Sequence, residues 1–397
     1  MANWLWIGSS TLLCFQWIVI HFSGGHPPPH WMALSSGVAI FGAAFMLSWA
    51  AELAQKDIPQ ALAIALLALI AVLPEYAVDM YFAWQAGKDP QYTSFAMANM
   101  TGANRLLIGV GWAAVVFTYW LKTGRKSIEL EPGHRSEILY LGLATVYSFV
   151  IPIKGTLDLI DAIAFIAIFV LYMRAASKAE HVEPELEGPP AMIESWGEGA
   201  RRIFTIVFFV YSGFTIFIAA EPFAEGLLAT GRTFGIEEFI LVQWLAPLAS
   251  ESPEFIVAIL FALKAQPGTS MGALLSSKVN QWTLLIGMLP VVFMVSAGRL
   301  GPMEMDQRQV EEMFLTAAQS LFAVAILANL SFSLVEAAVI FVLFSTQLLF
   351  PDPQFRFYYS FLYIVLAICL ILLKKDVRQG LTGLFSRAPA LEPSNKP

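Results

Sequence analysis

Charge is scarce in this sequence. Charged residues make up 13% of its 397 positions, whereas soluble domains carry about 25%. Hydrophobic residues make up 57%, and they gather in runs long enough to cross a bilayer, which takes about 20 apolar residues. No stretch remains that would fold as a separate soluble domain. The composition therefore predicts an all-α polytopic membrane protein.

Cysteine and histidine are also rare. The two cysteines, Cys14 and Cys369, both lie in apolar runs, which gives no support to a disulfide framework or a thiolate metal site. No nucleophile elbow, phosphate-binding loop or paired-histidine motif occurs, so a membrane enzyme is the weakest function class. We expect no cofactor and no nucleic-acid partner. The expected partners are inorganic cations, protons and the lipid bilayer.

Apolar runs bounded by Pro, Gly and charge clusters predict about twelve transmembrane helices. Lys and Arg number 15 in the even-numbered loops and the two termini, against six in the odd-numbered loops. Because cytoplasmic loops carry the excess, both termini are predicted to be cytoplasmic, and the setting that we expect is the cytoplasmic membrane of a prokaryote. The predicted spans are 4–21, 32–52, 58–84, 93–120, 136–153, 157–173, 202–220, 236–263, 270–297, 311–329, 333–350 and 356–373.

The chain divides into two similar parts. Residues 174–201 are rich in glutamate and contain a Gly-Pro-Pro breaker, which predicts an acidic cytoplasmic linker. We expect one five-span unit at 32–173 and a second at 202–350. Residues 1–31 and 351–397 then supply an extra span at each end, with the first span retained in the protein because no cleavage signal follows it.

Two matched stretches place carboxylates inside apolar runs. Glu75 and Asp79 are four residues apart in the third span, and Glu251 and Glu254 are three apart in the eighth, so each pair shares one helix face. Pro74 and Pro253 each precede a glutamate. Proline frees a backbone carbonyl, and irregular backbone is tolerated inside a membrane where it lines a cavity or is buried in protein. Charges inside spans mark ion or proton paths, although a single carboxylate of this kind can be a protonated or paired packing residue.

The span after each motif is rich in small residues, amides and hydroxyls. Neutral oxygens from such side chains can replace water around a cation. The two Pro-Glu stretches lie five spans apart, and an odd number reverses their orientation, which predicts an inverted repeat with the ion site between the halves. The candidate neutral ligands are Asn99, Asn104, Ser277, Asn280 and Gln281.

At these residues the sequence resembles the cation/calcium exchanger superfamily, which includes the sodium/calcium exchangers. Its members have two inverted five-span repeats, each with a Gly-Thr-Ser-Leu-Pro-Glu motif followed by a Gly-Ser-Asn motif. Leu73-Pro74-Glu75, Ser252-Pro253-Glu254 and Gly102-Ala103-Asn104 match parts of these motifs. The resemblance implies that Glu75 and Glu254 are the metal ligands that bind the transported Ca2+ and share it with Na+.

The sequence departs from the family pattern at the sodium ligands. Ala71 and Val72 replace the first Thr-Ser pair, and Lys278 replaces one motif asparagine. A buried lysine can act as a built-in cation in place of Na+, although a lysine near the end of a span can also reach the interface. Arg105 is expected to anchor a carboxylate such as Asp79.

Four ionised carboxylates against Arg105 and Lys278 leave two negative charges, enough for one divalent cation or two monovalent ions. Asp79, Glu251, Arg105 and Lys278 are the candidates for tuning charge or carrying protons. We therefore expect a secondary active antiporter that exchanges Ca2+ or Na+ and is coupled at least partly to H+. A Na+/Ca2+ exchanger of altered stoichiometry and a transport-inactive scaffold or sensor are the alternatives.

Overall fold

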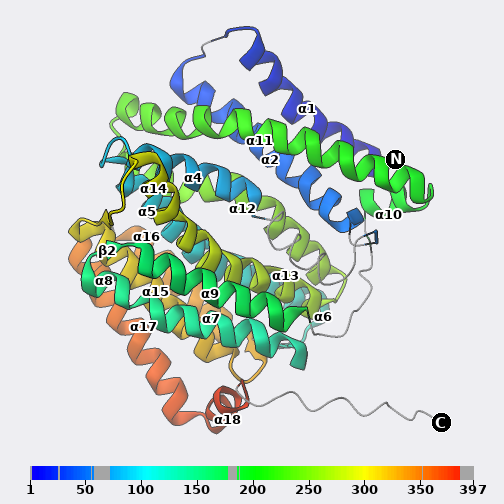
Figure 1. Cartoon of the computed structure of the whole chain (residues 1–397). Coiled ribbons are helices and arrows are strands. Elements are labelled where there is room, and N and C mark those ends of the chain that lie inside the picture. The colour runs from blue at the N-terminus through cyan, green and yellow to red at the C-terminus, as the bar shows by residue number, and fades with distance from the viewer. Residues whose placement is uncertain are drawn as a thin grey trace, which may run out of the picture.

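The computed structural model describes residues 2–25, 27–54, 56–57, 72–177, 186, 188–350 and 352–384, and within them the chain is almost entirely helical (Figure 1). Residues 58–71 of the predicted third span lie outside the described residues. In chain order the elements are α1 (Ala2–Phe22), α2 (Pro29–Ala54), α4 (Leu73–Ala86), α5 (Tyr92–Leu106), η1 (Leu107–Trp112), α6 (Ala113–Thr123), β1 (Ser127–Glu129), η2 (Pro132–His134), α7 (Arg135–Ser148), α8 (Val150–Lys154), β2 (Thr156–Leu157), α9 (Leu159–Ala176), α10 (Pro189–Glu194), α11 (Glu198–Phe234), α12 (Glu238–Leu263), α13 (Pro267–Asn280), η3 (Gln281–Leu285), α14 (Ile286–Ala297), β3 (Met303–Glu304), α15 (Gln307–Leu327), β4 (Ser331–Ser333), α16 (Leu334–Leu349), α17 (Pro353–Leu373) and α18 (Lys375–Leu384).

The helices are long and apolar enough to span a membrane. Among the described residues nine pass this test alone, and the bent helix α12 makes a tenth. The shorter apolar helix α16 and the segment that contains α4 are compatible with the twelve predicted spans. The chain is therefore an integral membrane protein of the all-α polytopic class, as the sequence predicted.

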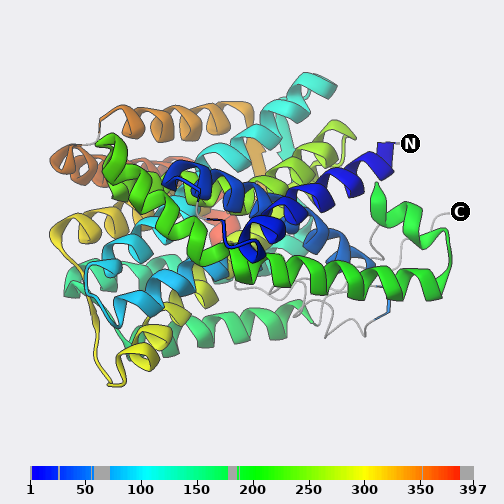
Figure 2. The ribbon, with the colours of Figure 1, turned by 90° about the horizontal axis from the view of Figure 1, so that it is seen from above.

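Helices α1, α2 and α11 pack together on one side of the molecule, as both views show (Figures 1 and 2). Asp57, just after α2, accepts hydrogen bonds of 2.8 and 2.9 Å from the Arg201 guanidinium of α11. The hydrogen bond from Arg201 holds the pKa of the Asp57 carboxyl below its usual range, since it favours the ionised form. The loop after α2 is thereby tied to the start of α11.

Two short β-pairs join the two halves of the chain. β1 pairs antiparallel with β4, and β2 pairs antiparallel with β3. β1 follows the fourth span and β3 follows the ninth, so these two strands are equivalent in the repeat. β2 precedes the sixth span and β4 precedes the eleventh, so they are equivalent as well. The inverted repeat therefore relates the β1–β4 pair to the β2–β3 pair. Paired strands lie on one side of a membrane, and the predicted odd and even loops agree with this constraint.

Helix ends repeat in the same way. Asp158 caps α9 in a reciprocal capping box with Asp161, and Ser333 caps α16 in one with Glu336. A π-helical segment, η1 or η3, follows each of the small-residue helices α5 and α13. Such segments are frequent at functional sites. The two halves therefore share local backbone chemistry as well as topology.

The contact between α5 and α12 is very close. A Cβ on Gly102 would lie 1.9 Å from the backbone oxygen of Gln243, so only glycine allows this approach. Small residues are the usual means by which membrane helices meet closely.

We predict that Gly102→Ala destabilises the protein by at least about 1–3 kcal/mol, the range for overpacking. Gly142→Ala is the matched control, because its nearest neighbour is the Val324 methyl at 3.5 Å. Thermal unfolding in detergent should separate the two variants. Equal melting temperatures would show that the α5–α12 contact is not as tight as described.

Candidate functional site

Glu75 lies in the first turn of α4, directly after Pro74. Pro74 is the second residue of α4, and proline is tolerated in the first turn because the backbone N–H groups there have no partner within the helix. The start of a helix carries a partial positive charge, so the backbone itself favours a carboxylate here. The Glu75 side chain is 2% exposed, and the helix start therefore places a buried acid within the membrane region.

Glu251 and Glu254 lie on either side of a break in α12. The axis bends by 54° between Glu238–Ser252 and Glu254–Leu263. The break falls at Pro253, a residue with no N–H to donate to the helix. Glu75 therefore lies at a helix start and Glu254 at a helix break, and transporter substrate sites typically lie on discontinuous helices.

The four predicted carboxylates come together from both halves. Glu75 lies within electrostatic range of Asp79, Glu251, Glu254 and Lys278. The predicted neutral partners are beside them: Asn99 donates to Asp79 at 2.9 Å, Gln281 donates to Glu251 at 2.9 Å, and Ser277 is hydrogen-bonded to Glu254. Tyr76 donates to the Asn280 side-chain oxygen at 2.9 Å.

Several oxygens at this site lack protein donors. Within the described residues, both carboxylate oxygens of Glu75 and one each of Asp79, Glu251, Asn99 and Gln281 are buried with no hydrogen-bond partner. Buried acceptors normally have partners, so these atoms require a proton, water or a cation. Oxygen ligands suit hard cations. No group of three His, Cys, Asp or Glu side chains in the described part of the chain is arranged to hold a metal ion in this conformation.

Lys278 is completely buried, so the alternative that it reaches an interface is wrong. Its ammonium donates to the Asn104 side-chain oxygen at 2.6 Å and to the Asn104 backbone oxygen at 3.3 Å. It also lies 4.3 Å from the ring centre of Trp282, which favours a cation. Asn104 is the motif asparagine of the first half, and Lys278 takes its place in the second. The lysine thus occupies the side-chain oxygen of a residue that the sequence predicts as a neutral cation ligand.

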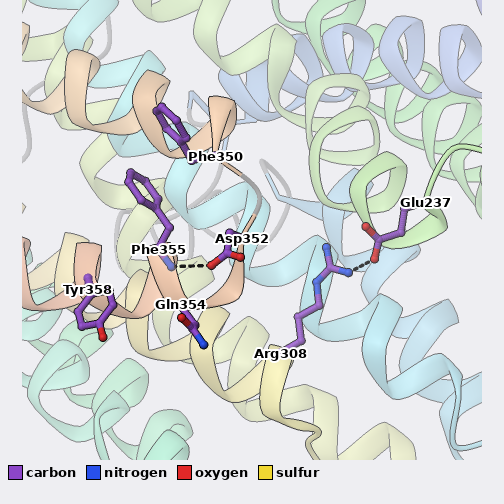
Figure 3. A pocket seen from close by; sticks show the side chains of 7 residues that line it. All are labelled: Glu237, Arg308, Phe350, Asp352, Gln354, Phe355 and Tyr358. Carbon is purple, nitrogen blue, oxygen red and sulfur yellow. Dashed lines mark hydrogen bonds and ion pairs between the residues drawn. The ribbon is translucent and has the colours of Figure 1, made fainter.

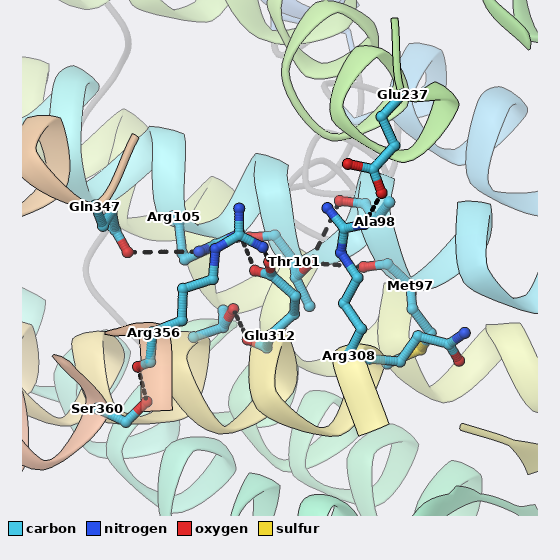
Figure 4. A network of polar contacts seen from close by, with 12 residues as sticks. Met97, Ala98, Thr101, Arg105, Glu237, Arg308, Glu312, Gln347, Arg356 and Ser360 are labelled. Atoms are coloured by element: carbon cyan, nitrogen blue, oxygen red, sulfur yellow. Dashed lines mark hydrogen bonds and ion pairs between the residues drawn. The ribbon is translucent and has the colours of Figure 1, made fainter. Parts of the chain in front are cut away.

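Arg105 does not bind Asp79, and this expectation is corrected. Its guanidinium pairs with Glu312 of α15, which also pairs with Arg356 of α17 (Figure 4). Gln347 of α16 accepts from Arg105 at 3.4 Å. All three charged side chains are buried. Arg105 therefore belongs to a separate polar network beside α5, and of the two basic residues only Lys278 acts on the four carboxylates.

Sequence reasoning missed Glu312 and Arg356. Glu312 is the second residue of the predicted span 311–329, and Arg356 is the first residue of the predicted span 356–373. The structure starts α15 at Gln307 and α17 at Pro353, which moves both charges into helices. A charge of each sign at the boundary of two neighbouring spans was the available signal.

A cavity of about 800 Å3 opens where the odd-numbered loops meet (Figure 3). Arg308 and Glu237 form an ion pair in its wall. None of the predicted site residues lines this cavity. Its lining residues are Glu237, Arg308, Phe350, Asp352, Gln354, Phe355 and Tyr358.

The chain matches the profile of the sodium/calcium exchanger protein family over residues 28–178 and 204–373. The chain belongs to this family. It is also similar to a solved structure of the H+/Ca2+ exchanger CAX, with 46% sequence identity over 96% of both chains and a TM-score of 0.93. Among curated protein sequences, none matches this chain.

Two more distant structures share the fold of this exchanger. The Ca2+/H+ antiporter YfkE is 15% identical with a TM-score of 0.63, over 93% of this chain and 99% of YfkE. The sodium-calcium exchanger NCX_Mj is 16% identical with a TM-score of 0.54, over 81% of this chain and 99% of NCX_Mj. The predictions of the family, the inverted-repeat fold and a cation antiporter are thereby confirmed.

We predict that Glu312→Gln destabilises the exchanger by about 3–5 kcal/mol, because two buried arginines lose their common partner. Glu238→Gln is the control: Glu238 pairs with the exposed Arg232, and such pairs contribute at most about 1 kcal/mol. Melting temperatures in detergent compare the two. A loss no larger than that of the control would mean that the Arg105 network contributes little to stability.

Proposed function

We propose that this exchanger is a secondary active antiporter that moves Ca2+ in exchange for H+. The observation that carries the proposal is the meeting of four carboxylates from both halves beside a buried lysine. Lys278 fills a place where the family motif has an asparagine, and its ammonium holds the oxygen of Asn104. The 46% identical relative is an H+/Ca2+ exchanger, which agrees with Ca2+ and H+ as the two exchanged ions.

In this proposal Glu75 and Glu254 are the primary Ca2+ ligands. They come from opposite repeats, so both halves hold the ion at once. Asn99, Ser277, Asn280 and Gln281 supply neutral oxygens, and Asp79 and Glu251 carry protons. Asn104 contributes by holding Lys278 in place.

The charge balance explains why Ca2+ and protons compete. With Arg105 neutralised by its own partner, the four carboxylates face one positive charge and leave three negative charges when fully ionised. Burying that charge without a partner is strongly unfavourable. One Ca2+ or several protons would neutralise most of this negative charge. Binding of one kind of ion therefore lowers the affinity of the site for the other. When the site opens to one side of the membrane, it can release Ca2+ and take up protons, or the reverse.

The orientation of the chain is part of the same proposal. The excess of Lys and Arg in the even-numbered loops supports a cytoplasmic position for these loops and both termini. The β1–β4 pair would then face the cytoplasm, and the β2–β3 pair would face the opposite side. A prokaryotic cytoplasmic membrane is the proposed location.

We predict that Glu75→Gln and Glu254→Gln each abolish Ca2+ uptake into proteoliposomes driven by a pH gradient. Each variant removes one of the two carboxylates that are the proposed primary Ca2+ ligands, and the remaining one would hold the ion from one repeat alone. Glu304→Gln, at an exposed position in β3, should transport normally. Normal uptake by both glutamine variants would exclude the proposed site. Uptake by no protein at all, wild type included, would favour the transport-inactive scaffold.

We predict that Lys278→Asn makes Ca2+ uptake sensitive to Na+. The change removes the buried ammonium, frees the oxygen of Asn104 and restores the asparagine of the family motif. Inhibition of labelled Ca2+ uptake by increasing Na+ at constant pH measures the effect, with Lys122→Asn on an exposed lysine as control. If wild type is already driven by a Na+ gradient and ignores a pH gradient, the assignment of H+ as the counter-ion is wrong.

A further inference from the structure

A second cluster of titratable groups lies beside α13, outside the four carboxylates. His134 ends η2, and its Nδ1 lies 2.5 Å from Oε2 of Glu137 in the first turn of α7. Ser276 of α13 donates to the other oxygen of Glu137 at 2.6 Å. The Tyr172 hydroxyl of α9 lies 3.3 Å from that of Ser276. Three elements therefore meet on one carboxylate.

The cluster connects an even-numbered loop with α13, the helix that carries Ser277 and Lys278. The side chains of His134 and Glu137 are 19% and 13% exposed, so protons from the aqueous side can reach them. A Cβ on Gly272 of α13 would lie 2.6 Å from the His134 ring, which means that the ring packs directly on the α13 backbone. Ser276 immediately precedes Ser277, the partner of Glu254.

We call the two sides toward which the ion site would open its mouths, one at the even-numbered loops and one at the odd-numbered loops. The inverted repeat places an arginine at the odd-numbered loops, in the position equivalent to that of His134. Asn104 and Lys278 are 174 positions apart, and the same spacing relates His134 to Arg308 and Ala98 to Gly272. As His134 packs on the Gly272 backbone, Arg308 points toward the part of α5 that carries Ala98 (Figure 4). Arg308 pairs with Glu237. The two mouths thus share a geometry but differ in charge chemistry.

We propose that His134 and Glu137 form a proton-binding site that controls opening of the ion site toward the even-numbered loops. A protonated His134 makes an ion pair with Glu137 and holds η2 and α7 against α13 through Ser276. A neutral His134 leaves only a hydrogen bond, so this mouth opens more easily. Arg308 is charged at every physiological pH. It therefore holds the opposite mouth closed whatever the pH.

The surroundings of His134 fit a group that titrates with the pH of the solution. The groups that face the pair are Glu131 on the preceding segment, Tyr172 from α9 and Ser276 from α13. Tyrosine and serine keep their protons over the range in which histidine changes charge, between about pH 5 and 8. His134 is therefore the member of the cluster whose charge changes.

The test measures exchange of labelled for unlabelled Ca2+ across proteoliposomes with equal pH on both sides. This assay rests on the proposed Ca2+ transport but needs no net H+ movement, so the two ideas fail separately. Each variant is compared with wild type at about pH 5.5 and about pH 9, because the pairing of His134 with Glu137 outweighs burial and shifts its titration upward from the usual histidine range. His21→Gln on α1 is the control and should match wild type at both values.

The two replacements of His134 are expected to act in opposite directions. His134→Gln removes the ion pair and should be severalfold faster than wild type at the lower pH and equal to it at the higher. His134→Arg keeps the ion pair permanently and should equal wild type at the lower pH and be severalfold slower at the higher. Arg308→His, which leaves His134 in place, should be faster than wild type at the higher pH only.

Three results would overturn the inference. One is that both His134 variants follow the wild-type rates at both pH values while retaining its melting temperature. Another is that Arg308→His adds no pH dependence, which tests the idea even if a His134 variant folds poorly. Wild-type protein that exchanges no labelled Ca2+ at any pH would remove the proposed function and this inference with it.

Discussion

The structure depends on how four carboxylates are kept together inside a membrane. The hydrocarbon around the protein supplies no hydrogen bonds, and an ionised side chain without a partner is strongly disfavoured. The protein supplies only part of what is needed: the start of α4, the amides of Asn99 and Gln281, and the ammonium of Lys278. Several oxygens remain without donors. Such unpartnered oxygens suit a site that binds and releases ions, whereas a set of fully paired charges would form an inert salt bridge.

Interrupted helices are the backbone counterpart of this constraint. α4 starts at Leu73, two residues before Glu75, and α12 bends between Ser252 and Glu254. A π-helical segment after α5 and another after α13 follow the amide-rich stretches. Gln319 of α15 donates to the backbone oxygen of Arg105 at 3.2 Å, where α5 passes into η1. Neighbouring helices thus satisfy the irregular backbone, which lets it persist within the membrane region.

Much of this arrangement was predictable because charge is so scarce. In an apolar chain each buried charge stands out, and two Pro-Glu stretches an odd number of spans apart specify an inverted repeat. The partner of Arg105 was not predictable in the same way. Glu312 and Arg356 lie at the starts of the predicted spans 311–329 and 356–373, where a shift of a few residues decides whether a charge is in a loop or in a span.

The short β-pairs were also beyond sequence reasoning, since two or three residues carry no clear alternating pattern. Their pairing depends on which loops the packed helices bring together. Once formed, they fix the loops of one half against the loops of the other at each end of the molecule. Opening of either mouth must therefore be accommodated by the helices and by contacts such as those of His134 and Arg308.

The two halves have one backbone plan and different charges, and this difference bears on direction. Lys278 stands opposite Asn104 in the repeat, Arg105 opposite Val279, and His134 opposite Arg308. A protein with identical halves would present the same ion chemistry to both sides and would respond equally to the pH of either. Placing the titratable residue at one mouth and the permanent charge at the other breaks that equivalence. The fold supplies alternating access by symmetry, and the departures from symmetry supply the control of which side opens.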